Sequence, residues 1–105
     1  MRRNLSGRKL VVTGAARGIG EKVARFAAAR GARVSLIGLE PDRLRALAAD
    51  LGPAALWRQA DVRDGAALRS AIDDCAQAMG GVDIVVANAG IAAYGMVRQA
   101  DEAAF

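Results

Sequence analysis

The sequence predicts an α/β fold in which a parallel sheet is wound on both sides by helices. Two observations support this prediction. Four short apolar segments alternate with three helix-periodic segments along the 105 residues, and such alternation favours parallel strands joined by right-handed crossovers. A glycine-rich turn, Thr13-Gly14-Ala15-Ala16-Arg17-Gly18-Ile19-Gly20, joins the first apolar segment to the first helical one. We expect the strand order 3-2-1-4, with a ligand crevice between strands 1 and 4.

The predicted strands are short apolar runs. Their residue ranges are Lys9–Thr13, Arg33–Ile37, Ala55–Gln59 and Asp83–Ala87. The continuous run Ile84–Ala87 carries no polar side chain, which is typical of a strand buried on both faces.

The predicted helices show apolar residues at a helical period. The first runs from Ile19 to about Arg30, ends at Gly31, and has the apolar stripe Ile19, Val23, Phe26 and Ala27. The second begins at Pro41, ends at Gly52-Pro53, and has the stripe Leu44, Leu47, Ala48 and Leu51. The third has Asp64 as N-cap, ends at Gly80-Gly81, and has the stripe Leu68, Ala71, Ile72, Cys75 and Met79. A fourth helix is expected to begin within Asp101–Phe105.

Composition bounds the class of protein. Hydrophobic residues make up 53% of the chain, enough for a packed core in one domain or part of one. There is no histidine, and Cys75 is the single cysteine, so we expect neither a disulfide nor a zinc-type metal site. The apolar run Leu10–Val12 is too short for a signal peptide, and no segment has the length of a membrane span, which favours a cytoplasmic protein without a membrane partner.

The net charge of +4 raises the possibility of a polyanionic partner. The arginines are scattered along the chain, and no basic helix interleaved with aromatic residues is found. We therefore expect no nucleic-acid partner. A nucleic-acid-binding function would also leave the glycine-rich turn unexplained.

The glycine-rich turn predicts a phosphate site. A helix N-terminus has unpaired N–H groups and a partial positive charge, and glycines allow a tight turn and close approach of a ligand. A second segment, Asn88-Ala89-Gly90, follows the fourth strand. In the order 3-2-1-4 both segments fall at the point where the strand order reverses, so two loops distant in sequence converge on one crevice.

With these motifs the chain resembles the N-terminal part of a short-chain dehydrogenase/reductase. The resemblance spans about Lys9 to Phe105 and rests on the spacing G-x-x-x-G-x-G in Gly14–Gly20, on Asp61-Val62 after the third strand, and on Asn88-Ala89-Gly90. It implies a Rossmann-type fold and a single dinucleotide-binding unit, residues 1–105, that forms part of a larger domain.

The resemblance also implies the cofactor-binding residues. Gly14, Gly18 and Gly20 would form the pyrophosphate turn, with backbone N–H groups near Ile19 facing the phosphate. Asp61 would accept a hydrogen bond from the adenine amino group, with the Val62 backbone beside it; the alternative for Asp61 is a solvated cap before the next helix. Asn88, Ala89 and Gly90 would line the adenosine-ribose and nicotinamide side, although Asn88 could instead only brace the sheet.

The cofactor is NADP or NAD, and NADP is weakly favoured. Arg17 occupies the turn position where NADP-preferring relatives often carry a basic residue, and a guanidinium pairs well with a phosphate. In the family register the acid that reads an unphosphorylated ribose falls at Gly38, followed by Leu39, which we place in the cofactor site. Glu40 could supply this acid if the turn is longer, or could be a helix N-terminal acid next to Pro41.

The family's catalytic serine, Tyr-x-x-x-Lys pair and helix-4 asparagine cannot be placed in this sequence. Its serines are Ser6, Ser35 and Ser70, its lysines are Lys9 and Lys22, and Tyr94 with Arg98 lies at the wrong position. We assign no catalytic residue. We expect the 105 residues to be half of a longer chain and to be inactive alone.

For the intact parent, the resemblance implies a homo-oligomeric NAD(P)-dependent oxidoreductase acting on an alcohol/carbonyl pair. The alternative is a catalytically silent dinucleotide-binding module, acting as a sensor or as a partner subunit. Such a module would bind cofactor without turnover.

Overall fold

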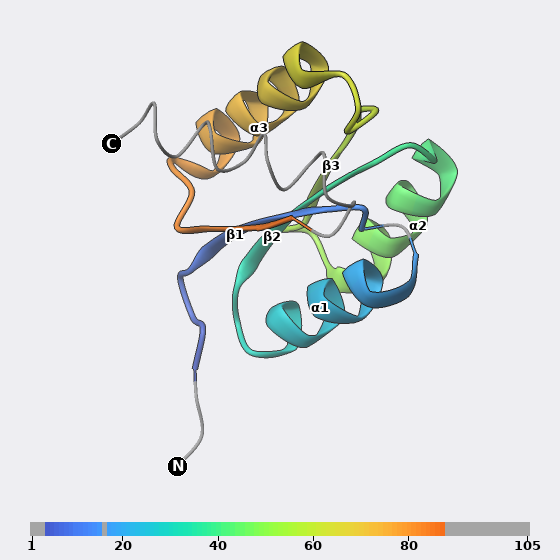
Figure 1. The fold of residues 1–105 in the computed structure, drawn as a ribbon. Helices are drawn as coiled ribbons and strands as arrows, with labels where there is room; N and C mark the ends of the chain where they lie inside the picture. The colour runs from blue at the N-terminus through green and yellow to red at the C-terminus, as the bar shows by residue number, and fades with distance from the viewer. Residues whose placement is uncertain (1–3, 16, 88–105) are drawn as a thin grey trace.

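The structure, a computed structural model, describes residues 4–15 and 17–87 (Figure 1). Its strands are β1 (Lys9–Thr13), β2 (Arg33–Gly38), β3 (Leu56–Gln59) and β4 (Ile84–Ala87). All pair in parallel, in the order β3-β2-β1-β4. The predicted fold class and strand order are therefore confirmed, and the strand limits differ from the prediction by at most one residue.

Three helices connect these strands: α1 (Gly18–Ala29), α2 (Pro41–Leu51) and α3 (Gly65–Met79). α1 and α2 cover one face of the sheet and α3 covers the other (Figure 1). Because successive side chains of a strand point to opposite faces, the central strands supply apolar residues to both layers. No helix within residues 4–15 and 17–87 is long and apolar enough to cross a membrane.

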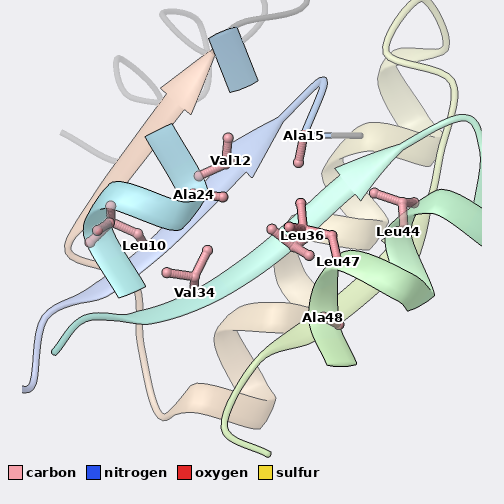
Figure 2. Packing of buried hydrophobic residues seen from close by; sticks show 10 residues of the cluster. Leu10, Val12, Ala15, Ala24, Val34, Leu36, Leu44, Leu47 and Ala48 are labelled. Carbon is pink, nitrogen blue, oxygen red and sulfur yellow. The ribbon is translucent and has the colours of Figure 1, made fainter. Parts of the chain in front are cut away.

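The core between the sheet and α1/α2 joins strand and helix side chains (Figure 2). It consists of Leu10, Val12, Ala15, Ala24, Ala27, Val34, Leu36, Leu44, Leu47 and Ala48. The predicted face of α2 is confirmed, apart from Leu51, which is only partly buried. Pro41 stands at the start of this helix, as predicted.

The core under α3 is smaller and contains the single cysteine. Its buried residues are Val11, Ile37, Ala60, Leu68, Ala71, Cys75 and Met79. The Ser35 hydroxyl, also buried, donates to Met79 Sδ at 3.3 Å. Burial raises the pKa of the Cys75 thiol, so this group stays neutral within the core, as its place on the apolar stripe predicted.

The ends of α3 follow the predicted capping. Asp64 accepts a hydrogen bond from the Ala67 amide at 3.1 Å, and Gly80 ends the helix in the left-handed region with φ 80°.

The predicted apolar stripe of α1 is only partly confirmed, because Ala27 is buried and Val23 packs partly buried against the core. Ile19 and Phe26 are 68% and 55% exposed, and the buried residues are Gly20, Ala24 and Ala27. Small side chains let the helix axis approach the sheet closely, which the larger side chains would prevent. Phe26 lies on the outer face, where the Arg30 guanidinium stacks on its ring at 3.8 Å from the ring centroid.

Burial of β4 on both faces is also not observed. Ile84 is 42% exposed and Val85, Val86 and Ala87 are half-buried. Within the described residues β4 pairs with β1 on one side, and no described strand pairs with its outer edge. The Asp101–Phe105 helix lies outside the described residues.

Replacement of Leu36 should show how much of the stability resides in the α1/α2 core. This side chain is fully buried in β2, so Leu36→Ala is expected to lower the free energy of unfolding by about 2–5 kcal/mol. Leu39→Ala removes the same atoms from a residue that is 53% exposed, and should change stability by less than about 0.5 kcal/mol. Urea denaturation of both variants measures the contrast, and equal losses would contradict the assigned core.

Candidate functional site

The carboxyl ends of the strands are aligned in one row. Thr13, the last residue of β1, is in register with Ile37 and with Ala87 of β4, and Gly38 at the end of β2 is in register with Gln59 of β3. In parallel sheets this edge is where ligands bind. The loops that leave these ends therefore form the candidate site.

The turn between β1 and α1 requires glycine at two positions. Gly14 and Gly18 have φ values of 64° and 54°, a region that other residues rarely adopt. Between them, the Ala15 amide donates to the Ile37 carbonyl at 3.2 Å, which ties the turn to β2. This geometry reverses the chain within a few residues and directs it into α1.

Within the described residues, no side-chain cap is found at the first turn of α1. Arg17 is the N-cap residue, but its side chain makes no capping hydrogen bond. The amides of Gly18, Ile19 and Gly20 belong to the first turn, where N–H groups have no acceptor within the helix. The site thus has the features expected for a pyrophosphate: uncapped donors, a positive helix end and a turn with little side-chain bulk.

Arg17 is instead paired with Glu40, at the start of α2. Arg17 Nε donates to Glu40 Oε1 at 2.8 Å, and Arg17 Nη2 donates to Glu40 Oε2. Arg43 Nε lies 4.0 Å from the same carboxylate. Hydrogen bonding from Arg17 holds the pKa of Glu40 below its usual value, so the carboxylate is ionised at neutral pH.

This contact bears on the two alternatives for Glu40, which are an acid that binds the ribose and an acid at the N-terminus of α2. Its backbone occupies the N-cap position of α2, yet its side chain makes no capping bond. The carboxylate faces the glycine-rich turn instead of the helix end.

Leu39, between β2 and Glu40, is 53% exposed at the same edge. Its carbonyl accepts a hydrogen bond from Gln59 Nε2 at 3.1 Å. Gln59 therefore fixes the backbone that presents Leu39. This role of Gln59 was not predicted from the sequence, where its only signal is an amide side chain at the end of the strand next to β2.

Asp61 follows β3 and is held by Arg63. Oδ1 accepts from the Arg63 amide at 2.9 Å and from Nε at 3.1 Å, and Oδ2 accepts from Nη2 at 2.9 Å. Side-chain and backbone hydrogen bonds from Arg63 lower the pKa of Asp61. The N-cap residue of α3 is Asp64, and Asp61 binds the Arg63 amide just before this helix. Val62 packs partly buried against the α3 core.

The remaining predicted residues cannot be placed. Asn88, Ala89 and Gly90, together with Tyr94 and Arg98, lie outside the described residues. Within the described part, the structure joins Arg17 to Glu40 and Leu39 to the end of β3, both along one edge of the sheet.

The comparisons with known proteins agree with this geometry. Residues 8–105 match the family model of the short chain dehydrogenases. Nodulation protein G of Rhizobium sp. (strain N33) is 41% identical over 98 residues, which cover 92% of this chain and 40% of that protein.

Solved structures give the same result. A short chain dehydrogenase from Burkholderia cenocepacia J2315, in complex with NADP, has a TM-score of 0.79 and 42% identity over 85% of this chain and 38% of its own. A 3-ketoacyl-(acyl-carrier-protein) reductase from Brucella melitensis, complexed with NADH, has a TM-score of 0.75 and 32% identity over 78% of this chain and 34% of its own.

The chain therefore spans less than half the length of these relatives. Its match to the family model nevertheless covers nearly all of its own residues. With the parallel sheet, the glycine-rich turn and this match together, the chain belongs to the short-chain dehydrogenase family.

Proposed function

We propose that this chain is the cofactor-binding part of an NAD(P)-dependent oxidoreductase that acts on an alcohol/carbonyl pair. The observation that carries the proposal is the open first turn of α1 behind the Gly14–Gly18 turn. When bound, the nicotinamide group would supply or accept the hydride. Family membership and the relatives complexed with NADP and NADH support the class of cofactor.

The proposed roles of the described residues are binding and orientation. The amides of Gly18, Ile19 and Gly20 donate to the pyrophosphate, and Gly14 leaves room for it. Asp61 accepts from the adenine amino group beside the Val62 backbone, and Leu39 borders the adenosine. Asn88, Ala89 and Gly90 complete the nicotinamide side in the proposal.

No catalytic residue is proposed within the 105 residues. The catalytic serine, tyrosine and lysine would belong to the rest of the parent domain, of which this unit is the cofactor-binding part. A cytoplasmic location and a homo-oligomeric parent also remain predictions.

A turnover assay separates the proposal from its alternative, the silent binding module. The parent protein should oxidise NADPH or NADH in the presence of carbonyl compounds. The loss of absorbance of the reduced cofactor measures this oxidation over a panel of ketones and aldehydes. Binding of cofactor without turnover of any carbonyl compound or any alcohol would favour the silent module. Absence of binding would contradict both.

A preference for NADP is the finer proposal, with Arg17 as the residue that reads the 2′-phosphate. A guanidinium can pair with two phosphate oxygens, but here Glu40 occupies the same donors. The phosphate would have to take Arg17 from Glu40. We therefore propose that Glu40 weakens an intrinsic preference for NADP, which would let both cofactors bind.

Two substitutions test this competition. Arg17→Ala should weaken NADP binding by about tenfold, because charge-assisted hydrogen bonds to the phosphate are lost, and should change NAD binding much less. Glu40→Gln should strengthen NADP binding, because it frees Arg17 and removes a repelling charge. Dissociation constants from calorimetric titration measure both effects.

The matched control is Arg45→Ala, which removes the same charge from an exposed residue of α2 that pairs with Asp42 at 2.9 Å. It should leave the ratio of the two dissociation constants unchanged. Equal loss of NADP and NAD affinity in Arg17→Ala would show that Arg17 does not read the 2′-phosphate.

A further inference from the structure

The contact between Asp61 and Arg63 occupies some of the acceptor positions of the Asp61 carboxylate and leaves another unused. A carboxylate offers about four acceptor positions, two on each oxygen. Oδ1 already accepts two hydrogen bonds, both from Arg63, whereas Oδ2 accepts one. Within the described residues, therefore, Oδ2 has one acceptor position left and Oδ1 has none.

The backbone around Asp61 is held as firmly as its side chain. The Ala60 amide donates to the Gly38 carbonyl at 2.9 Å, and the Asp64 amide donates to the Asp61 carbonyl at 2.9 Å. The Asp61 side chain is 35% exposed, so a ligand can reach it, while the Arg63 side chain is 79% exposed. Arg63 has no other side-chain partner in the described part of the chain, and two of its guanidinium nitrogens, Nε and Nη2, donate to this carboxylate.

We infer that Arg63 is a positioning residue, which orients the free acceptor position of Asp61 Oδ2 for the exocyclic amino group of adenine. This inference rests on the proposed function, because it requires a bound dinucleotide. Without the Arg63 side chain only the amide bond to Oδ1 would remain, and the carboxylate could rotate more freely about its terminal torsion, which has a broad energy profile. The base would then meet a mobile acceptor, and discrimination between bases would decrease.

Base discrimination is a direct readout of this role. Adenine carries an amino donor at C6, whereas hypoxanthine carries an oxygen acceptor at the same place. A fixed carboxylate oxygen accepts from the first and repels the second. We therefore compare NADP with its hypoxanthine counterpart, using the ratio of the two dissociation constants obtained by calorimetry.

The protein is expected to bind NADP more tightly than the hypoxanthine form. Arg63→Ala should reduce this ratio about threefold, in keeping with the modest strength of an exposed ion pair. Arg63→Lys should restore part of it, because a lysine retains the charge but lacks the planar fork. Arg69→Ala, which removes the same charge from an exposed position on α3, should leave the ratio unchanged. Thermal unfolding of each variant shows whether the fold is intact.

The outcomes separate this inference from the proposed function. An unchanged ratio in Arg63→Ala, with discrimination intact in the unsubstituted protein, would overturn the positioning role and leave dinucleotide binding standing. Equal binding of the two dinucleotides by the unsubstituted protein would overturn the reading of adenine by Asp61, and the inference with it. Failure to bind either would overturn the proposed function itself.

Discussion

Parallel pairing with β1 is the constraint on which the other features of this chain depend. β1 lies between β2 and β4, and parallel strands require a crossover after each strand. Each crossover returns the chain to the same starting edge, so all strands end at the opposite edge. The loops after β1, β2 and β3 gather there because of topology, and the residues that could recognise a ligand gather with them.

Close packing of the first crossover on the sheet has a second consequence. α1 approaches the strands through Gly20, Ala24 and Ala27, and only the four residues 14–17 separate its first residue from the end of β1. Larger residues at these positions would lift the helix and move its N–H groups away from the edge. Packing of the core and placement of the first-turn N–H groups, the proposed phosphate donors, are therefore one structural requirement. The left-handed backbone at Gly14 and Gly18 satisfies the local part of this requirement.

The charged groups at the edge are arranged in pairs. Glu40 is bound to Arg17, and Asp61 is bound to Arg63. The Arg17–Glu40 pair connects two loops, whereas the Asp61–Arg63 pair lies within one loop. A bound ligand would therefore affect the two pairs differently. A phosphate would compete for Arg17, whereas an amino group could use the remaining acceptor of Asp61 without disturbing Arg63.

Local patterns predicted the strands and the capping of α3 well, because short apolar runs, Asp64 and Gly80 act through nearby backbone. On α1 they placed Val23 and Ala27 correctly against the core. They misplaced Ile19 and Phe26, since periodicity ranks residues by hydrophobicity while close packing on a sheet selects small residues. They also overstated the burial of β4, which depends on what covers its outer edge.

The Arg17–Glu40 pair joins residues 23 positions apart, and no pattern in the sequence specifies such a contact. The Arg63 contact spans two positions and could have been inferred from the spacing Asp-x-Arg after a strand.

In our proposal, the first turn of α1 binds the pyrophosphate of a nicotinamide dinucleotide. Amide proton–nitrogen correlation spectra recorded during titration with NADP test it most directly. If this turn holds the pyrophosphate, the largest shifts occur at the amides of Gly18, Ile19 and Gly20. Further shifts are expected at Asp61 and Val62, and none of similar size at the opposite ends of the strands. Saturable binding that leaves the Gly18–Gly20 amides unshifted would contradict it.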